Sequence, residues 1–228
     1  MSRYSKEDCI STLQYEYTRS MRESPSRISN IPKRDKLHSW AIDLLPEIQC
    51  SIHTRLLGCS YLDHYLRSKP DTNPEAYCLL AVVSFSFALK FEESFIITPQ
   101  QISEMFDKKY SPEDVKTLEL YFLLTLDWNL AKSTSPYIAR LLLDATCDGN
   151  CEKIAEKADR FCIMGEINSV VAKNGEFLVA VAAVSLALKS LGFLTFLEEW
   201  WVEVQKYVDI SRVENDKIAR CILGLFSN

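Results

Sequence analysis

The feature that most constrains the fold of this chain is an uncharged, largely apolar run over residues 76–89, which ends at Lys90. A membrane-spanning helix needs about 20 consecutive apolar residues, so this run is too short to span a bilayer. A helix that is apolar on all sides is instead buried in a protein core, and the helix dipole favours a cation at its C-terminal end. The run therefore predicts a buried core helix with Lys90 near its C-terminal end.

A second copy of this helix follows about 100 residues later. The segment AVVSFSFALK (81–90) aligns with AVAAVSLALK (180–189), and the two share the final Ala-Leu-Lys. In each half of the chain this is the third and most apolar helix of a series. An internal repeat of this kind predicts a five-helix unit, built twice around a buried central helix.

The spacing of apolar residues predicts helices along the chain, and no long alternation of period two predicts a strand. We expect the first series at 35–49, 51–68, 74–92, 99–107 and 112–126. We expect the second series at 136–145, 151–172, 176–190, 195–207 and 212–226. A separate helix over about 4–21 precedes both, with an apolar face formed by Ile10, Leu13, Tyr17 and Met21. The predicted fold class is all-α.

Four pairs of a small polar residue and a proline are expected to begin helices. They are Asn73-Pro74, Thr98-Pro99, Ser111-Pro112 and Ser135-Pro136. The small polar side chain accepts a free backbone amide at a helix start, and proline in the first turn lacks the amide that would be unpaired there. Gln101, three residues after Thr98, predicts a capping box.

Composition and cysteine spacing restrict the class of partner and the compartment. The net charge is −5, which does not favour nucleic acid or anionic membranes as partners. Of the eight cysteines only Cys147 and Cys151 lie close together in sequence, without a second pair or a neighbouring histidine to complete a zinc site. We expect free thiols, with a metal site or disulfide as the alternative. The N-terminal segment has no apolar core of a signal peptide, so we expect an intracellular protein.

No set of residues suggests catalysis. The three histidines, His38, His53 and His64, are far apart in sequence and have no recognisable nucleophile beside them, so structural or surface roles are expected. No glycine-rich phosphate loop is present, and the chain is not expected to transfer or hydrolyse phosphate itself. We predict a protein that is not an enzyme and that holds no cofactor or metal.

Four segments carry a resemblance to a known family. They are KRDKLHSWAIDLL (33–45), CSYLDHYL (59–66), FALKFEE (87–93) and TLELYFLLTLDWNL (117–130). Together with the repeated five-helix unit, their order and spacing resemble the cyclin family and its cyclin box. The segment LDWNLAKSTSP (126–136) is most similar to G1 or D-type cyclins, and a divergent or viral cyclin is also compatible.

The resemblance implies three parts in the chain. Residues 1–32 would form an N-terminal helix and linker, 33–132 the first, kinase-binding cyclin box, and 133–228 a second cyclin-like fold. In cyclins the leading helix is an additional kinase contact, although it could equally pack on its own protein.

Two pairs of residues receive roles from the resemblance. Arg34 and Asp63 match a buried ion pair that joins the first two helices of the box. Lys90 and Glu119 match the lysine and glutamate of the surface that grips a protein kinase. A lysine donates to backbone carbonyls and a glutamate accepts from backbone amides, so such a pair can hold a partner's main chain.

Aromatic residues are expected beside the lysine and glutamate. Phe91 and Trp128 match positions that would supply an apolar anchor surrounded by these charges. Taken alone, Lys90 could be a solvated helix-end cation and Trp128 could be a core residue. The shared register of the four residues favours a kinase-binding role.

The usual cyclin docking patch for substrates and inhibitors is degenerate. Leu37 and Trp40 retain part of it, but Lys33 and Lys36 occupy positions that are usually apolar and Cys78 one that is usually polar. Docking of the usual motifs is therefore in doubt.

The resemblance implies a regulatory subunit that binds a cyclin-dependent kinase as a heterodimer and activates it during the cell cycle, in the nucleus and cytoplasm. Substrate or inhibitor proteins are further possible partners. Two alternatives stay open. One is a transcription-initiation factor of the TFIIB type, which shares the repeated fold but should be basic. The other is a cyclin-fold scaffold that binds a partner without activating it.

Overall fold

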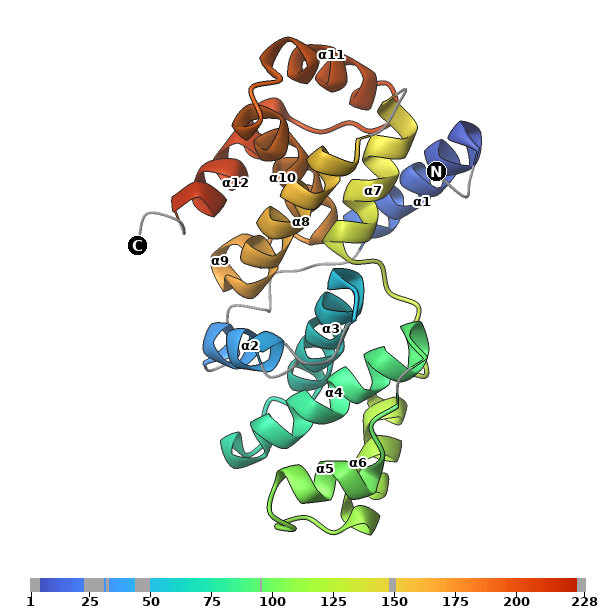
Figure 1. The fold of residues 1–228 in the computed structure, drawn as a ribbon, viewed down its shortest axis with the longest axis vertical. Coiled ribbons are helices and arrows are strands. Elements are labelled where there is room, and N and C mark those ends of the chain that lie inside the picture. The colour runs from blue at the N-terminus through green and yellow to red at the C-terminus, as the bar shows by residue number, and fades with distance from the viewer. Residues whose placement is uncertain are drawn as a thin grey trace. The chain divides into compact units, whose positions relative to one another are not determined.

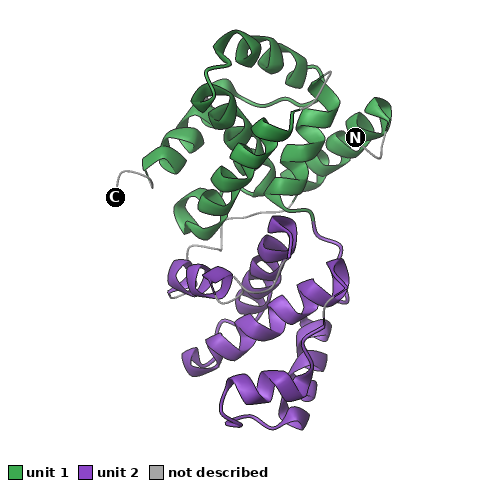
Figure 2. Ribbon diagram, in the orientation of Figure 1, with its two compact units in different colours: residues 1–29, 133–228 green, residues 30–132 purple. Residues whose placement is uncertain are grey.

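The structure, a computed structural model, describes residues 5–22, 31, 33–43, 50–94, 96–147 and 151–224. Every regular element within these residues is a helix (Figure 1), which confirms the predicted all-α class. The chain forms two compact units (Figure 2). We call residues 30–132 the first-repeat unit, and residues 1–29 with 133–228 the second-repeat unit.

The first-repeat unit is built around one central helix. Its elements are α2 (Arg34–Asp43), α3 (Ile52–Ser68), the 3-10 helix η2 (Pro74–Ala76), α4 (Tyr77–Glu92), α5 (Pro99–Met105) and α6 (Pro112–Thr125). Helix α4 packs against α2, α3 and α6, and α5 packs against α6. The end of the expected helix over 35–49 lies outside the described residues from position 44 onward.

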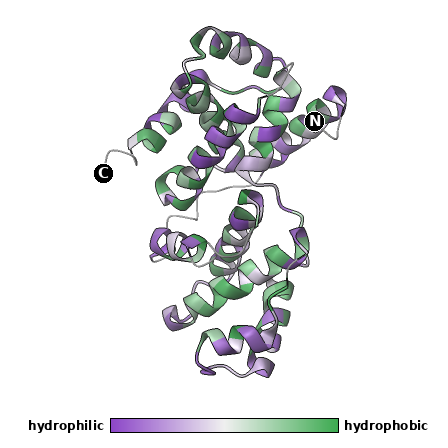
Figure 3. Ribbon diagram, viewed as in Figure 1, coloured by the Kyte–Doolittle hydropathy of each residue, from purple (hydrophilic) through white to green (hydrophobic). Residues whose placement is uncertain are grey.

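Helix α4 is the buried helix that the uncharged run predicts. All of its residues from 79 to 89 are buried, including Ser84, whose hydroxyl donates to the carbonyl oxygen of Ala81. Figure 3 shows α4 largely in the hydrophobic colours. Among the described residues, Pro74–Glu92 is the one helical stretch with the length and composition of a membrane span, but 67% of that window is buried inside the protein. Core helices of water-soluble proteins share these properties.

The second-repeat unit has the same plan. Its elements are α7 (Ser135–Thr146), α8 (Glu152–Ile167), α9 (Ser169–Ala172), α10 (Glu176–Ser190), α11 (Leu194–Val204), α12 (Arg212–Gly224) and the leading helix α1 (Lys6–Arg22). Helix α10 is central and packs against α7, α8 and α12. Its residues 179–188 are all buried. In each unit, therefore, the lysine of the repeated Ala-Leu-Lys segment lies in the last turn of the central helix.

The leading helix belongs to the second-repeat unit. Helix α1 packs against α7 and α10, and the Tyr17 hydroxyl donates to the carbonyl oxygen of Asp209 at 2.7 Å. The buried face consists of Cys9, Leu13 and Glu16. The prediction that Met21 lies on this face is wrong, because Met21 is 57% exposed. Contacts with α7 and α10 decide which side of this helix is buried.

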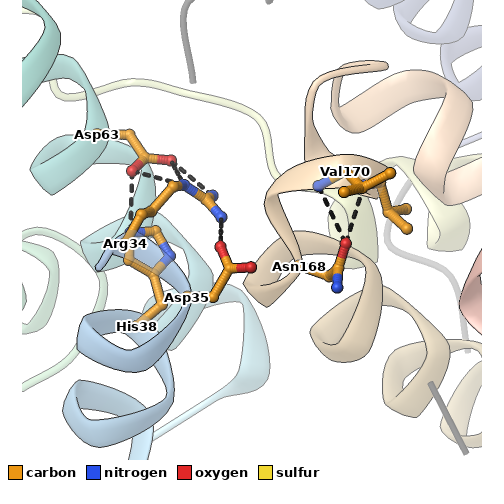
Figure 4. Close-up of polar contacts among 7 residues, drawn as sticks. Arg34, Asp35, His38, Asp63, Asn168 and Val170 are labelled. Atoms are coloured by element: carbon orange, nitrogen blue, oxygen red, sulfur yellow. Dashed lines mark hydrogen bonds and ion pairs between the residues drawn. The ribbon is translucent and has the colours of Figure 1, made fainter. Parts of the chain in front are cut away.

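The single helix expected over 151–172 is two helices. Helix α8 ends at Ile167, and Asn168 has an extended backbone. The Asn168 side-chain oxygen accepts from the backbone amides of Val170 and Val171 and so begins α9; Figure 4 draws this cap with Val170 labelled. Asparagine competes with helical hydrogen bonds through such local contacts, which explains the break.

Three of the four expected caps are present. Asn73, Thr98 and Ser111 each accept a backbone amide at a helix start, and both Thr98 and Ser111 form capping boxes. The fourth prediction is wrong. Thr134 is the N-cap of α7, whereas Ser135 lies inside the first turn and is fully buried. Pro136 is therefore the second residue of α7, and the helix begins one residue earlier than predicted.

A glycine lets the second helix of the first-repeat unit approach the central helix closely. A Cβ atom added to Gly58 on α3 would lie 2.9 Å from the ring of Phe85 on α4. We therefore expect Gly58→Val to lower the free energy of unfolding by about 2–3 kcal/mol, since an overpacked core must shift. Urea denaturation would measure this loss. Gly224→Ala is the control, because among the described residues no atom of another element lies within 4 Å of the added Cβ; equal stability of both variants would contradict the prediction.

Candidate protein-binding surface

A lysine and a glutamate form a pair on the surface of the first-repeat unit. Lys90 lies in the last turn of α4, and its Nζ is 2.7 Å from Oε1 of Glu119 on α6. The side chains are 27% and 15% exposed, so both reach the surface. Lys90 Nζ also lies 5.4 Å from the centre of the Phe87 ring. The ammonium has three donor hydrogens and the carboxylate has several lone pairs, so both can still bind a partner's backbone.

Two aromatic side chains on these elements are exposed. Phe91 follows Lys90 directly and is 47% exposed, while Trp128 follows the end of α6 and is 62% exposed. Trp128 is thus not a core residue. Single exposed apolar side chains are ordinary on protein surfaces, so exposure alone does not assign these two residues to a contact.

The backbone that presents Trp128 is unusual. Asp127 and Trp128 both have positive φ angles, 51° and 57°. The Trp128 amide donates to the carbonyl oxygen of Leu123 at 3.0 Å and so ends α6 in a left-handed turn. Bulky residues rarely adopt this conformation, and it is concentrated at functional sites. The turn is a structural reason to treat Trp128 as part of a binding surface.

Helix α3 fixes the segment that follows Trp128. The Tyr61 hydroxyl donates to the carbonyl oxygen of Leu130 at 2.5 Å. Nδ1 of His64, one turn further along α3, lies 3.0 Å from Nζ of Lys132. The structural role expected for His64 is thus a contact to this segment.

This contact makes the stability of the unit depend on pH. Burial, followed by the charges of Lys132 and Arg67, lowers the pKa of His64 below its ordinary value of 6.5. The unfolded chain therefore binds the proton more readily, and the free energy of unfolding should fall as the pH decreases through 6.5. Urea denaturation between pH 7.5 and about 5 would measure this slope. We expect the slope to be shallower in His64→Gln, and an unchanged slope would contradict the assignment.

A second pair of charges is buried inside the unit. Arg34 on α2 donates from Nε and Nη2 to the Asp63 carboxylate on α3, with distances of 2.7–3.0 Å. Nε2 of His38 lies 2.9 Å from Asp63 Oδ1. Figure 4 shows these three side chains converging. Burial opposes ionisation of Asp63, but His38 and Arg34 outweigh it and hold the pKa of the carboxyl well below its usual range.

The contact between His38 and Asp63 was not among the roles predicted from the sequence. His38 is four residues after Arg34, so both lie on the same face of α2. This four-residue spacing is the sequence feature from which the contact could have been predicted. The cluster joins α2 to α3 from within and is not a binding surface.

The degenerate docking patch is reduced further by burial. Leu37 is only 8% exposed and is part of the core, whereas Trp40 is 38% exposed. Lys33, Lys36 and Cys78 are exposed as well. Trp40 is thus the apolar residue of this patch that remains accessible.

The second-repeat unit carries an equivalent of the Lys90–Glu119 pair. Lys189 ends the repeated segment on α10, and its Nζ is 3.1 Å from Oδ1 of Asp216 on α12. These side chains are 39% and 40% exposed. The repeat therefore reproduces a lysine at the end of the central helix paired with a carboxylate on the last helix.

The close cysteines are free thiols. Burial, followed by a hydrogen bond with Cys151, raises the pKa of Cys147 to about 12. A thiol with this pKa is protonated at neutral pH and is a poor metal ligand. Within the described ranges no group of three or more histidine, cysteine, aspartate or glutamate residues could hold a metal ion.

Comparison with known proteins assigns the family. The family model described as "Cyclin, N-terminal domain" matches residues 2–131, more than half of the chain. The repeated helical units and this match define a cyclin-box protein: the chain belongs to the cyclin family.

Named relatives come from several cyclin classes. The chain is 28% identical to Cyclin-B2-1 of Arabidopsis thaliana over 55% of its own length and 29% of the relative's. It is 24% identical to G1/S-specific cyclin-D3 of Bos taurus, over 70% of the chain and 55% of the relative. It is also 24% identical to G2/mitotic-specific cyclin S13-6 of Glycine max, over 84% of the chain and 41% of the relative. The aligned part is thus about a third to just over half of each relative.

Proposed function

We propose that this cyclin is the regulatory subunit of a cyclin-dependent protein kinase, which it binds as a heterodimer and activates. The observation that carries the proposal is the Lys90–Glu119 pair at the surface of the first-repeat unit. Phe91, which follows Lys90 directly, and Trp128, which follows α6, are both exposed. The charges would hold the main chain of a kinase segment, and the two aromatic side chains would anchor apolar groups beside it.

Activation would follow from selective binding. The first-repeat unit would press on the mobile helix of the kinase, whose glutamate must pair with the ATP-site lysine for phosphoryl transfer. Because the cyclin would bind only this active arrangement tightly, it would increase the population of the active state. The chain itself would contribute no catalytic group.

Within the cell cycle we propose a G1-type role, supported by the similarity of LDWNLAKSTSP (126–136) to G1 and D-type cyclins. Named relatives include both a G1/S-specific and a G2/mitotic-specific cyclin, so the class rests on this segment. A location in the nucleus and cytoplasm belongs to the same proposal.

The test is activation of purified kinases. The full chain is mixed with a panel of inactive, monomeric cyclin-dependent kinases, and histone phosphorylation and binding are measured in parallel. We expect at least one kinase to bind and to gain activity. Binding without a gain in activity would support the scaffold alternative, and no binding to any kinase would overturn the proposal. Salt-dependent DNA binding would favour an initiation factor instead.

A further inference from the structure

Two cysteines lie at the ends of neighbouring helices in the second-repeat unit. Cys147 follows α7 directly as its C-cap, and Cys151 immediately precedes α8 as its N-cap. The Cys147 amide donates to the carbonyl oxygen of Leu143 at 2.8 Å. The Cys151 carbonyl oxygen accepts from the amide of Ala155 at 2.9 Å. Main-chain hydrogen bonds to a helix therefore fix the position of each cysteine.

Packing of the two helices brings these ends together. Helix α7 packs against α8. The Arg140 guanidinium on α7 donates from both terminal nitrogens to the carboxylate of Glu152, the residue after Cys151, at 2.9 Å each. The thiols of Cys147 and Cys151 are hydrogen-bonded to each other. Both cysteines are only partly buried, so a small molecule in solution can reach them.

We propose that Cys147 and Cys151 are a modification site, which a small-molecule disulfide such as oxidised glutathione converts into an intramolecular disulfide that joins α7 to α8. The structure shows the reduced form, in which both residues are free thiols. This site lies within the second-repeat unit, and it does not depend on the proposed kinase partner.

Oxidation takes place in two thiol–disulfide exchanges. In the first, the Cys151 thiolate attacks one sulfur of oxidised glutathione, whose sulfur–sulfur bond breaks. A mixed disulfide forms, and one glutathione leaves as a thiolate. In the second, the Cys147 thiolate attacks Sγ of Cys151, which releases the other glutathione and closes the protein disulfide. The two protons that the protein thiols lose to water are taken up by the two glutathione thiolates, so two protein thiols are oxidised and one small-molecule disulfide is reduced.

The order of the two steps follows from the environment of Cys147. Its raised pKa, about 12, keeps the Cys147 thiol protonated at neutral pH, and the thiolate is the form that attacks a disulfide. Cys151 therefore reacts first. Burial, the largest cause of the raised pKa, persists after this step, whereas the contribution of the Cys151 thiol is lost. The second exchange should be slow at neutral pH and should become faster as the pH rises.

The same environment favours the disulfide once it has formed. A dithiol resists oxidation when its reduced form is stabilised, as in strongly oxidising disulfide carriers. Burial instead disfavours the Cys147 thiolate, so the reduced site lacks this stabilisation. The helix ends also hold the two residues near each other before the bond forms. We therefore expect a persistent disulfide and not a transient exchange intermediate.

Mass spectrometry of the full chain tests the site directly. Trypsin cleavage after Arg140 and Lys153 gives a peptide, residues 141–153, that contains Cys147 and Cys151 and no other cysteine. The chain is incubated with oxidised glutathione at about pH 8, and the remaining thiols are then alkylated. We expect most of this peptide to escape alkylation and to be about 2 Da lighter than its reduced form. A peptide that is alkylated at both cysteines, or that keeps glutathione without closing, would overturn the proposal.

Two single variants test the order of the steps. Cys147→Ser should stop the reaction at the mixed disulfide and leave about 305 Da of glutathione on Cys151. Cys151→Ser should leave Cys147 largely unmodified at neutral pH, because the Cys147 thiol stays protonated. Equal addition of glutathione in the two variants would overturn the assigned order. The matched control is Cys221→Ser, which removes an exposed thiol on α12 and should form the 147–151 disulfide as the wild type does.

Urea denaturation tests whether the fold accommodates the bond. The midpoint of the oxidised chain should be at least as high as that of the reduced chain, since a disulfide between residues that are already close restricts mainly the unfolded state. Reduced Cys147→Ser should unfold at the midpoint of the reduced wild type. A lower midpoint after oxidation would show that the bond distorts the ends of α7 and α8, and would overturn a disulfide site built into this fold.

Discussion

Replacing Lys90 and Glu119 together by alanine is expected to abolish kinase activation while leaving the fold intact. Hydrogen bonds from charged groups are worth about 1.5–3 kcal/mol each when a buried partner would be left unpaired. Loss of both should weaken kinase binding by at least about 100-fold. The pair itself is partly exposed, and such pairs stabilise a fold by about 0–1 kcal/mol. Histone phosphorylation across a cyclin titration would measure the loss, and urea denaturation would confirm the intact fold.

The internal repeat supplies the control for this experiment. Lys189→Ala/Asp216→Ala removes an equivalent lysine–carboxylate pair at the corresponding position of the second-repeat unit. We expect activation to remain near the wild-type level in this control. Equal activation by the Lys90→Ala/Glu119→Ala variant and the wild type would contradict the binding role of the pair. Equal losses in the two double variants would show that charge removal, and not the site, caused the effect.

The second large effect is expected at the buried cluster. Asp63→Ala should lower the free energy of unfolding by about 3–5 kcal/mol, because it removes one partner of a buried, hydrogen-bonded ion pair. Arg34 is only 3% exposed, and the Asp35 carboxylate, 3.5 Å from its Nη1, is 43% exposed, so this second pair should offset little of the loss. Urea denaturation at neutral pH would measure this change.

Removing both charges should cost less than removing one. Apolar side chains often replace a buried ion pair at little cost, so Arg34→Met/Asp63→Leu should recover much of the stability lost in Asp63→Ala. Asp216→Ala, which removes an exposed carboxylate, should change stability by less than about 1 kcal/mol. A loss of that small size in Asp63→Ala would contradict the buried role of the cluster.

Patterns within a few residues of sequence predicted a helix correctly where a single interaction, burial or capping, determines it. The uncharged run over residues 76–89 predicted the buried helix α4, and Thr98 and Ser111 predicted their capping boxes. Predictions failed where two local signals competed. Asn168 interrupts a continuous helical pattern because its side chain caps a new helix, and Thr134 displaces Ser135 as the cap of α7.

The sequence alone predicted some properties of the candidate surface but not others. The resemblance named Lys90 and Glu119, but only the packing of α4 on α6 brings their side chains to 2.7 Å. As a large apolar residue, Trp128 could have been part of the core. It is presented at the surface by a left-handed turn, and no short sequence pattern predicted that turn. The exposed Leu120 and Leu124 on α6 look like ordinary core residues in the sequence.

The sequence by itself determined the all-α class, the repeat and the place of the two buried central helices, because apolar periodicity and caps act within a few residues along the chain. Only the tertiary structure decided that His38 joins Arg34 and Asp63, that α1 packs on the second repeat, and which apolar side chains of α6 stay exposed. These properties depend on which helix faces lie opposite one another, and burial at such a face is set by residues far away in sequence.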